Sequence, residues 1–365
     1  MENIKRIGVL TSGGDAPGMN AAIRAVCRTA LTRGVEVMAI YRGYSGLIDG
    51  DIKPMKLRDV SNVINKGGTM LYSDRCPQFK EKEVRAKAIE NCKKLGIEGI
   101  ICIGGDGTFQ GATRLTEEGI PCIGIPATID NDITSTDNTI GFDSAMNTVI
   151  ELVDKLRDTC ESHARCNVVE VMGRGAGDIT INTAIATGAV ACVIPEAPFD
   201  EEACINKIIR LRREGKRSFL IIVSEAFPTL GEELAKKITA ITKDLSEKEG
   251  NDRLWVESKF CRLAHTVRGG SPSLSDRLTA TRMGVRAVDE LLAGNSDLII
   301  VERGGKITTC GIRWSQVLDR MYKGTLKDGM LDGYTSAQIA DMEHFINDKK
   351  KTFAETYAIL NELAN

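Results

Sequence analysis

Two short loops hold the residues whose types and spacing are best suited to chemistry. The first loop, residues 104–108 (GGDGT), places three glycines around the carboxylate of Asp106. Glycine allows φ > 0 and lets backbone N–H groups approach a ligand that a Cβ would push away. A lone carboxylate is a poor ligand for a phosphate but a good one for the Mg²⁺ that accompanies a nucleotide. This loop therefore predicts phosphate and Mg²⁺ binding.

The second loop, residues 128–132 (TIDND), carries two carboxylates at i and i+2, Asp130 and Asp132. It follows a strand-like apolar run, and ligands of open α/β sheets bind at the carboxyl ends of the strands. Together the loops indicate a phosphoryl-transfer centre, with one loop for phosphates and metal and the other for a base. Taken singly, GGDG could be only a tight connection and TIDND only a turn with Asx hydrogen bonds. Two such loops separated by one helix-and-strand unit favour the functional interpretation.

Strands and helices in a regular order must position these loops. Apolar runs at residues 100–103 and 120–125 predict two buried strands, and residues 108–115 predict the start of a helix whose free N–H groups favour an anion. The same order of strand, glycine loop and helix occurs at residues 6–32, where the loop contains Gly13 and Gly14. We therefore expect two glycine loops of one parallel sheet to converge on one ligand.

The remaining chain continues this alternation. Strands are predicted at residues 35–40, 167–171, 191–194, 218–224 and 298–301, and helices at 81–95, 144–158, 181–187, 201–214 and 275–292. Residues 41–50 are predicted to be a glycine-rich loop, 236–257 a charged segment with little pattern, and the polar tail from residue 303 to contain two helix-like runs. This order predicts a second doubly wound α/β unit.

Length and composition limit the class of protein. A chain of 365 residues exceeds what one hydrophobic core usually covers, so two domains are expected. The formal net charge of −2 gives no basic surplus for nucleic acid or an anionic membrane. No signal peptide is recognisable at the start, and no apolar run approaches the ~20 residues that span a bilayer. The 11 cysteines form no CxxC pair and several lie in apolar runs, which indicates reduced core thiols. We expect a cytoplasmic protein.

Further charged residues fall near the predicted strand ends, and these are Arg165, Arg174, Glu225, His265 and Arg268. Together they indicate a pocket for a phosphorylated polyol, with arginines for the phosphate and Glu or His for the hydroxyls. Each alone has a simpler interpretation, because His265 could be a core histidine, Glu225 a solvated strand end, and the arginines surface ion-pair partners. Arg75, in a segment without clear periodicity, could likewise be a solvated loop cation.

The order and spacing of these motifs resemble those of ATP-dependent 6-phosphofructokinases of the bacterial type. The matching segments are GVLTSGGDAPGMNAAIRA (8–25), IGGDGT (103–108), PATIDND (126–132), VVEVMGR (168–174), SEA (224–226) and HTVRGGSP (265–272). The resemblance implies transfer of the γ-phosphoryl of MgATP to the 1-hydroxyl of fructose 6-phosphate, the committed step of glycolysis. It also implies two doubly wound α/β domains with mainly parallel sheets and the active site between them. The expected domains are residues 1–140 plus about 262–310 for nucleotide, 141–261 for sugar phosphate, and a helical extension at 311–365 packing on the core.

The resemblance assigns roles to individual residues. Asp130 is similar to the base that takes the proton of the sugar hydroxyl, and Asp106 to the Mg²⁺ ligand. Residues similar to those that assist transfer are Thr128, Asp132 and Arg174. Residues similar to the ATP site are Gly14, Arg75, Cys76, Gly105, Asp106, Gly107, Thr108 and Gly111. Residues similar to the fructose 6-phosphate site are Thr128, Ile129, Asp130, Met172, Gly173, Arg174, Glu225, His265 and Arg268.

Other matches imply assembly and regulation. Arg165 matches an arginine that the family supplies from a neighbouring subunit, which implies a homotetramer, and a second such arginine aligns with Lys259, with Arg262 close by as a substitute. Lysine keeps the charge but not the bidentate fork. The effector site for ADP or phosphoenolpyruvate is matched by Arg24, Arg28, Arg157, Lys216 and Arg217. Two positions depart from that site, because Val190 replaces a metal-binding glutamate and Glu214 a lysine.

Three alternative classes share part of this pattern. Pyrophosphate-dependent relatives carry aspartate where this chain has Gly107 and lysine where it has Ala127, so ATP is the expected donor. NAD and lipid kinases share a GGDGT loop but lack the TSGGDAPG and HxxRGGSP elements. A catalytically silent regulatory subunit would be expected to have lost Asp106, Asp130 or Arg174, and all three are present.

Overall fold

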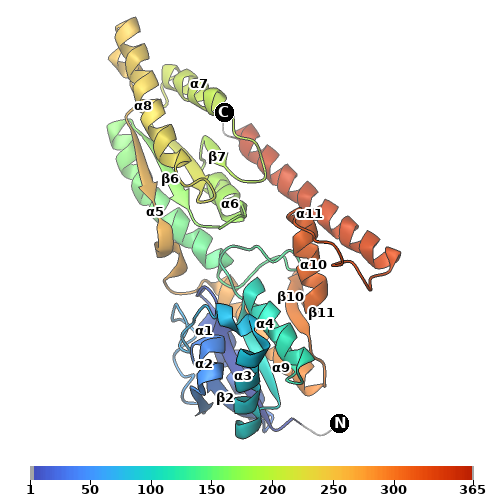
Figure 1. The fold of residues 1–365 in the computed structure, drawn as a ribbon. Coiled ribbons are helices and arrows are strands. Elements are labelled where there is room, and N and C mark those ends of the chain that lie inside the picture. The colour runs from blue at the N-terminus through green and yellow to red at the C-terminus, as the bar shows by residue number, and fades with distance from the viewer. Residues whose placement is uncertain (1–3, 364–365) are drawn as a thin grey trace. The chain divides into compact units, whose positions relative to one another are not determined.

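The computed structural model describes residues 4–363 and contains two compact units, each with its own sheet and core (Figure 1). Unit 1 comprises residues 4–144 and 268–346, and unit 2 comprises residues 145–267 and 347–363. None of the helices formed by residues 4–363 has the length and apolar character that crossing a bilayer requires.

Unit 1 is built on one twisted sheet. Its strands are β1 (Arg6–Ser12), β2 (Glu36–Ile40), β3 (Ile52–Met55), β4 (Gly99–Gly104), β5 (Cys122–Pro126), β10 (Leu298–Arg303) and β11 (Lys306–Gly311). Within the described chain the strand order is β11-β10-β5-β4-β1-β2-β3, with all pairs parallel except the two at the edges. Every residue of β4 is buried, as expected for an apolar central strand covered on both faces.

The strand order reverses between β1 and β4. From β1 the chain continues outward to β2 and β3, then returns to β4 on the other side of β1 and proceeds to β5. The two strands are parallel with Ser12 opposite Gly104, so both glycine loops begin at the same level of the same sheet edge. Such a switch point is where doubly wound sheets bind ligands.

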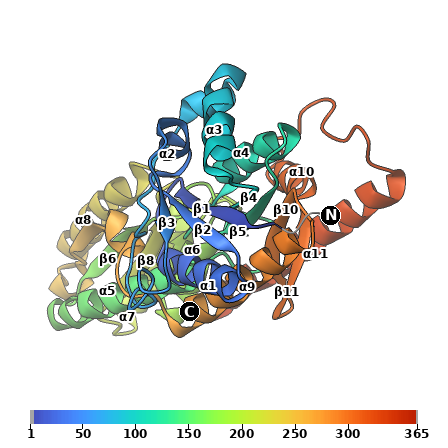
Figure 2. The same cartoon turned by 90° about the horizontal axis from the view of Figure 1, so that it is seen from below.

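Helices cover both faces of this sheet (Figure 2). One face carries α1 (Met19–Thr32) and α9 (Leu274–Leu292), and the other carries α2 (Gly43–Asp49), α3 (Lys82–Leu95), α4 (Asp106–Glu117) and α10 (Ile312–Tyr322). Small residues allow α1 and α9 to approach closely, since a Cβ added at Gly284 would lie 2.6 Å from the Cβ of Ala25.

Unit 2 is a smaller α/β unit. Its strands are β6 (Cys166–Val171), β7 (Ala191–Val193), β8 (Phe219–Ser224) and β9 (Ser258–Arg262), which pair in parallel in the order β7-β8-β6-β9. The last helix of the chain, α11, is Ser336–Leu363. The helical segments of unit 2 are α6 (Asp178–Ala186), α7 (Glu201–Arg213), α8 (Leu230–Glu249), most of α5 (Phe142–His163) and the part of α11 from residue 347. The predicted fold class, two doubly wound α/β units with mainly parallel sheets, is confirmed.

Three segment predictions were wrong. Residues 41–50 contain the helix α2, where Gly46 is required because an added Cβ would lie 1.6 Å from the carbonyl oxygen of Tyr41. The charged segment 236–257 contains most of α8, whose pattern is weakened by two polar residues on its buried face, Thr242 and Ser246. The tail contains β11 and α10 ahead of α11, which is one helix instead of two runs.

Candidate active site

The two glycine loops of unit 1 are joined directly. The hydroxyl of Thr108 donates to the carbonyl oxygen of Ser12 at 3.0 Å, which links the end of β4 to the end of β1. Helix α4 begins at Asp106, two residues earlier than predicted, and Gly105 provides no side-chain cap. Its first N–H groups therefore lie at the sheet edge and favour an anion. An added Cβ at Gly107 would meet no atom within 4 Å, so open space adjoins this turn.

The acid loop, residues 128–139, follows β5 beside the glycine loop. Asp130 and Asn131 are buried, and Asn131 has left-handed backbone geometry at φ 52°. The Asn131 side chain holds this turn, because its Oδ1 accepts from the Thr139 N–H at 3.0 Å and its Nδ2 donates to the Asp137 carbonyl at 3.2 Å. The side chain of Ile129 is fully buried, so only its backbone is available to a ligand.

Arg268 lies against Asp130. Its Nη2 is 3.6 Å from Asp130 Oδ1, and both side chains are largely buried. Arg268 also donates to the carbonyl oxygen of Asp15 at 3.2 Å. A Cβ at Gly14 would lie 2.9 Å from Arg268 Nη1, so glycine at this position allows the guanidinium to approach. The structure thus brings the loop that contains Gly13 and Gly14 together with the predicted base, Asp130, through one arginine.

The other predicted nucleotide residues of unit 1 differ in their surroundings. The segment containing Arg75 and Cys76 passes beside the loop that contains Gly13 and Gly14, since the Gly13 N–H donates to the Asp74 carbonyl at 3.3 Å. Arg75 is exposed, and Cys76 packs on the core. Gly111 is buried under Tyr44, whose ring would lie 2.5 Å from an added Cβ, so glycine here serves packing.

The donor set of unit 1 fits a metal that arrives with a nucleotide. Among the described residues, no cluster of three or more His, Cys, Asp or Glu side chains could hold a metal by itself. Asp106 is a single, partly exposed carboxylate that accepts from Gln110 Nε2 at 2.8 Å. Mg²⁺ commonly takes one or two carboxylates and completes its shell with water and substrate phosphates. Asp106 fits that role.

The sequence interpretation missed two cations that contact Asp106 and Asp132, and these are Arg320 of α10 and Lys323, the C-cap residue directly after it. Arg320 Nη2 lies 3.9 Å from Asp106 Oδ2, and Lys323 Nζ lies 3.5 Å from Asp132 Oδ2. Both belong to the polar tail, where no motif distinguishes them. A possible signal was the amphipathic pattern of residues 312–322, which marks a helix with one polar face.

Unit 2 has a cavity of about 260 Å³ at the carboxyl ends of its strands. Its lining includes Met172, Glu225 and His265 of the predicted sugar-phosphate site. Glu225 Oε1 accepts from the Arg174 N–H at 2.7 Å and from the Gly173 N–H at 3.2 Å. Arg174 has left-handed geometry at φ 57°, a strained conformation that is typical of functional sites.

An ion pair not predicted from the sequence also lines this cavity. Arg262 Nε donates to Glu170 Oε1 at 2.6 Å, and the Glu170 side chain is only 6% exposed. The sequence contains a signal for the importance of Glu170, because this charged residue lies inside the otherwise apolar segment VVEVM (168–172). The sequence predicts Arg262 only as a substitute for Lys259, and the structure places it on the cavity with His265.

Arg165 and Lys259 lie at the other end of the same sheet. Arg165 precedes β6 and its Nε is 2.5 Å from Glu257 Oε2, while Lys259 Nζ is 2.6 Å from Glu257 Oε1. The structure therefore does not bring Arg165 together with Arg174, Glu225 and His265 within this unit. The two residues that the resemblance assigns to a neighbour share one carboxylate.

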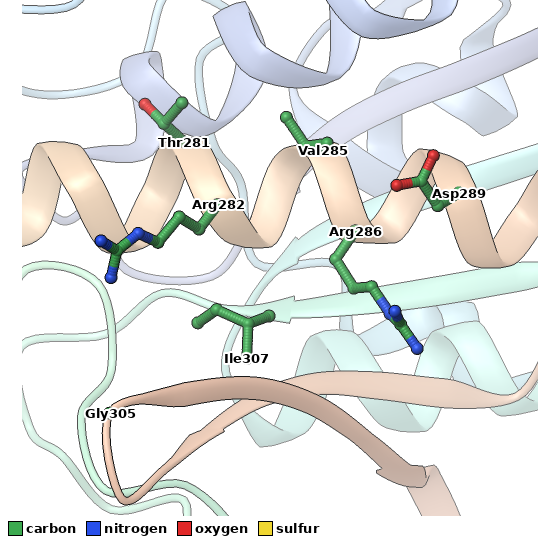
Figure 3. A pocket seen from close by; sticks show the side chains of 7 residues that line it. All are labelled: Thr281, Arg282, Val285, Arg286, Asp289, Gly305 and Ile307. Carbon is green, nitrogen blue, oxygen red and sulfur yellow. The ribbon is translucent and has the colours of Figure 1, made fainter.

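A separate cavity of unit 1, of about 570 Å³, lies between α9 and the turn from β10 to β11 (Figure 3). Figure 3 shows Arg282, Arg286 and Asp289 along it, and none of the predicted site residues lines it. Arg286 pairs with Glu290 at 2.5 Å and Asp289 pairs with Arg33, so much of its charge is already compensated. We assign this cavity no part in the reaction.

A parallel sheet with two glycine loops at its switch point and a carboxylate loop beside them defines an α/β protein suited to bind a phosphorylated ligand. The phosphofructokinase family model matches residues 6–291. The chain belongs to the phosphofructokinase family, and the resemblance predicted from its motifs is confirmed.

Individual relatives agree with this membership. The chain is 51% identical over 304 residues to the ATP-dependent 6-phosphofructokinase of Bacillus velezensis, which covers 83% of this chain and 91% of that relative. It is similar to the solved phosphofructokinase of Saccharomyces cerevisiae, with a TM-score of 0.80 and 31% identity over 97% of this chain. This chain spans 49% of that yeast chain. A pyrophosphate-dependent phosphofructokinase from Marinobacter aquaeolei, at a TM-score of 0.71 and 22% identity over 94% of this chain and 92% of that one, shares the fold.

Proposed function

We propose that this chain is an ATP-dependent 6-phosphofructokinase, which transfers the γ-phosphoryl of MgATP to the 1-hydroxyl of fructose 6-phosphate and yields fructose 1,6-bisphosphate and ADP. The observation that carries the proposal is the contact between Arg268 and Asp130 at the carboxyl edge of the unit 1 sheet. A buried carboxylate for the hydroxyl proton and a cation for the developing charge are the groups that phosphoryl transfer requires. Curated relatives with this activity, about half identical to the chain, support the same assignment.

In this proposal unit 1 binds the nucleotide. The glycine loops and the first N–H groups of α4 receive the phosphates, and Asp106 would hold the Mg²⁺ that arrives with the nucleotide. When bound, the metal would supply positive charge for the transferring phosphoryl group. The residues proposed to contact nucleotide are Gly14, Arg75, Cys76, Gly105, Asp106, Gly107, Thr108 and Gly111. Gly111 would act indirectly, by letting Tyr44 pack beneath the helix.

The sugar is deprotonated and held by other residues. Asp130 takes the proton of the sugar 1-hydroxyl while the hydroxyl oxygen attacks the γ-phosphorus of ATP. Thr128 and Asp132 help to position the transferred phosphoryl group. Arg268 places positive charge beside Asp130, and in this proposal that charge favours the negative charge on the oxygens of the transferring phosphoryl group. Residues of unit 2 proposed to bind fructose 6-phosphate are Met172, Gly173, Arg174, Glu225 and His265.

We propose a homotetramer in which Arg165, with Lys259, serves the sugar-phosphate site of a neighbouring copy. The position of both residues away from Arg174 and Glu225 supports this. A cytoplasmic location, where ATP and phosphorylated sugars are available, is part of the proposal. Regulation through Arg24, Arg28, Arg157, Lys216 and Arg217 stays a prediction of the sequence.

A coupled assay on the purified protein tests the proposal. Fructose 1,6-bisphosphate formation is measured with fructose 6-phosphate and either ATP or pyrophosphate as donor, each with Mg²⁺. We expect turnover with ATP and negligible turnover with pyrophosphate. Comparable kcat/KM for the two donors would favour the pyrophosphate-dependent alternative, and no turnover with either would overturn the proposal.

A further inference from the structure

The helix α10 lies outside the region that the family model matches, which ends at residue 291. It nevertheless contacts the acid loop through a series of side chains at i, i+4 and i+8. These are Ser315 and Asp319 of α10 and Lys323, the C-cap residue directly after it, whose backbone is still helical. The three side chains share one face because residues four apart lie above one another on a helix. Each contacts a different position of the acid loop.

The middle contact is buried. Asp319 is 5% exposed, and its Oδ1 accepts from the Thr134 N–H at 2.5 Å. The hydroxyls of Ser315 and Ser135 lie 2.7 Å apart, and both residues are fully or almost fully buried. A buried N–H that lost its acceptor would cost about 1–3 kcal/mol. These two contacts therefore fix the backbone of the acid loop against α10.

The end contact reaches the carboxylate proposed to position the transferred phosphoryl group. Lys323 Nζ donates to the backbone carbonyl oxygen of Asp132 at 3.1 Å and lies 3.5 Å from Asp132 Oδ2. One ammonium group thus contacts the backbone and the side chain of the same residue. The Asp132 side chain is only 11% exposed, so this ion pair is less screened than a surface pair.

The far side of α10 is anchored. Val317 and Leu318 pack with Met342 and Ile346 of α11 in a cluster of their own. The guanidinium of Arg303 lies 5.1 Å from the centre of the Trp314 ring and donates to the Ser135 carbonyl at 2.9 Å. Because α10 is held on both sides, its contacts limit the positions that the acid loop can adopt.

We infer that α10 belongs to the catalytic apparatus, with Lys323 as a positioning residue that holds Asp132 and with Asp319 as the anchor of the acid loop. The inference rests on the proposed function, because it assigns Asp132 a part in phosphoryl transfer. Displacing a reacting group by about 1 Å can lower a rate about a hundredfold, so a clamp on this loop acts on turnover. Lys323 does not touch substrate in this assignment and acts through Asp132.

The test compares three variants with the wild-type enzyme. Lys323→Met removes the charge and keeps the length of the stem, Lys323→Arg keeps the charge, and Lys327→Met alters an exposed lysine four residues on. We expect kcat to fall about tenfold to a hundredfold in Lys323→Met, with KM for fructose 6-phosphate changed by less than about twofold. Lys323→Arg is expected to recover most of kcat, and Lys327→Met to match the wild type.

A double-mutant cycle separates positioning from a general loss of structure. If Lys323 acts through Asp132, adding Lys323→Met to Asp132→Asn should lower kcat by less than about twofold further. Multiplicative effects of the two changes, or full kcat in Lys323→Met, would overturn the inference.

Hydrogen exchange gives a readout that does not depend on activity. Amides of residues 132–136 should exchange at least about tenfold faster in Lys323→Met and in Asp319→Ala than in the wild type, while β4 amides remain unchanged. Unchanged exchange in both variants would overturn the clamp even in an active enzyme. A wild-type protein without 6-phosphofructokinase activity would instead contradict the proposed function, and the exchange result would still decide whether α10 holds the loop.

Discussion

Arg165 and Arg174 flank β6 at its opposite ends. Arg174 follows the carboxyl end, where its N–H binds Glu225, and Arg165 precedes the amino end, where it pairs with Glu257. The six residues of β6 span roughly 20 Å at 3.3 Å per residue. Within one copy of unit 2, Arg165 and Arg174 therefore belong to opposite edges of the sheet.

This separation predicts complementation between inactive variants. If Arg165 serves a neighbour, mixing Arg165→Ala with Asp130→Asn should create sites with neither change. Each site needs an intact Asp130 from its own chain and an intact Arg165 from a neighbour. In an equal mixture each condition holds for about half of the sites, so random exchange would give about a quarter of the wild-type activity. The measurement is kcat after subunit exchange has been confirmed by mass spectrometry.

The matched control is a mixture of Asp130→Asn with Arg174→Ala, two residues that the resemblance places in one chain's site. That mixture should remain inactive. Recovery in the control, or its absence in the Arg165 mixture, would show that the sites are not shared as proposed.

Asp130 is expected to dominate the chemical step. Asp130→Asn keeps the size of the side chain but removes the base, so kcat should fall by about 10²–10⁴-fold. Binding of fructose 6-phosphate, measured by calorimetry, should change little. Asp137→Asn is the control from the same loop, since the Asp137 carboxylate accepts from the Gly304 N–H at 2.6 Å and has no part in the proposed chemistry. A variant that retained more than about a tenth of kcat would remove Asp130 from this role.

The choice of donor depends on two small residues. A carboxylate at position 107 would enter the open space at the start of α4 and repel the α-phosphate of ATP. Ala127 is fully buried next to the loop of residues 104–108, and its N–H donates to the Gly104 carbonyl. We expect Gly107→Asp with Ala127→Lys to lower kcat/KM for ATP at least about tenfold, since a like charge costs a few kcal/mol in a dry site. Gly107→Asn is the uncharged control. Equal loss in the Asn variant would mean that size, and not charge, excludes the nucleotide.

Asp319 predicts a pH dependence of stability. Burial raises the pKa of its carboxyl to about 6, although the Thr134 N–H and Lys323 favour the charged form. A folded-state pKa above the unfolded value contributes stability that is complete below the unfolded pKa of 3.8 and is lost as pH rises through about 6. Asp319→Asn keeps an acceptor for Thr134 without ionising, so the variant should be more stable than the wild type at pH 8, by up to roughly 3 kcal/mol.

Urea unfolding at pH 8 and pH 5 measures this difference, which should shrink at the lower pH. Asp319→Ala is the control, because it removes both the charge and the acceptor and should be destabilised at both values. A pH-independent gain in Asp319→Asn would contradict the raised pKa.

The parts of the site that are local in sequence could be predicted, and the parts that depend on distant contacts could not. Asp106 and Asp130 follow apolar runs directly, so their place at strand ends was readable from the chain. The charge pattern places Arg165 with the other strand-end residues, although it precedes its strand and hence lies at the opposite edge of the sheet. In a parallel sheet the distinction between the two ends decides which residues can share a ligand.

Helix α8 and the cations of α10 show two other limits. Thr242 and Ser246 lie on the buried face of α8 and so interrupt an apolar pattern, and the Thr242 hydroxyl donates to the Ile238 carbonyl. Lys323 meets Asp132 only because α10 returns to the acid loop after β11, and no local pattern in a polar tail encodes that return. Arg268 and Asp130 also lie far apart in the sequence, but there the HTVRGGSP motif marks Arg268 as a site candidate.

The contact between Lys323 and Asp132 spans 191 residues of chain. A ribosome adding about 5–20 residues per second makes that interval roughly 10–40 s long. During this time the strands β1, β4 and β5 are already synthesised, while the helix that holds the acid loop does not yet exist. The nascent protein therefore carries its carboxylates before it can hold them in place, and the order of synthesis delays the competent site until α10 and Lys323 have been made.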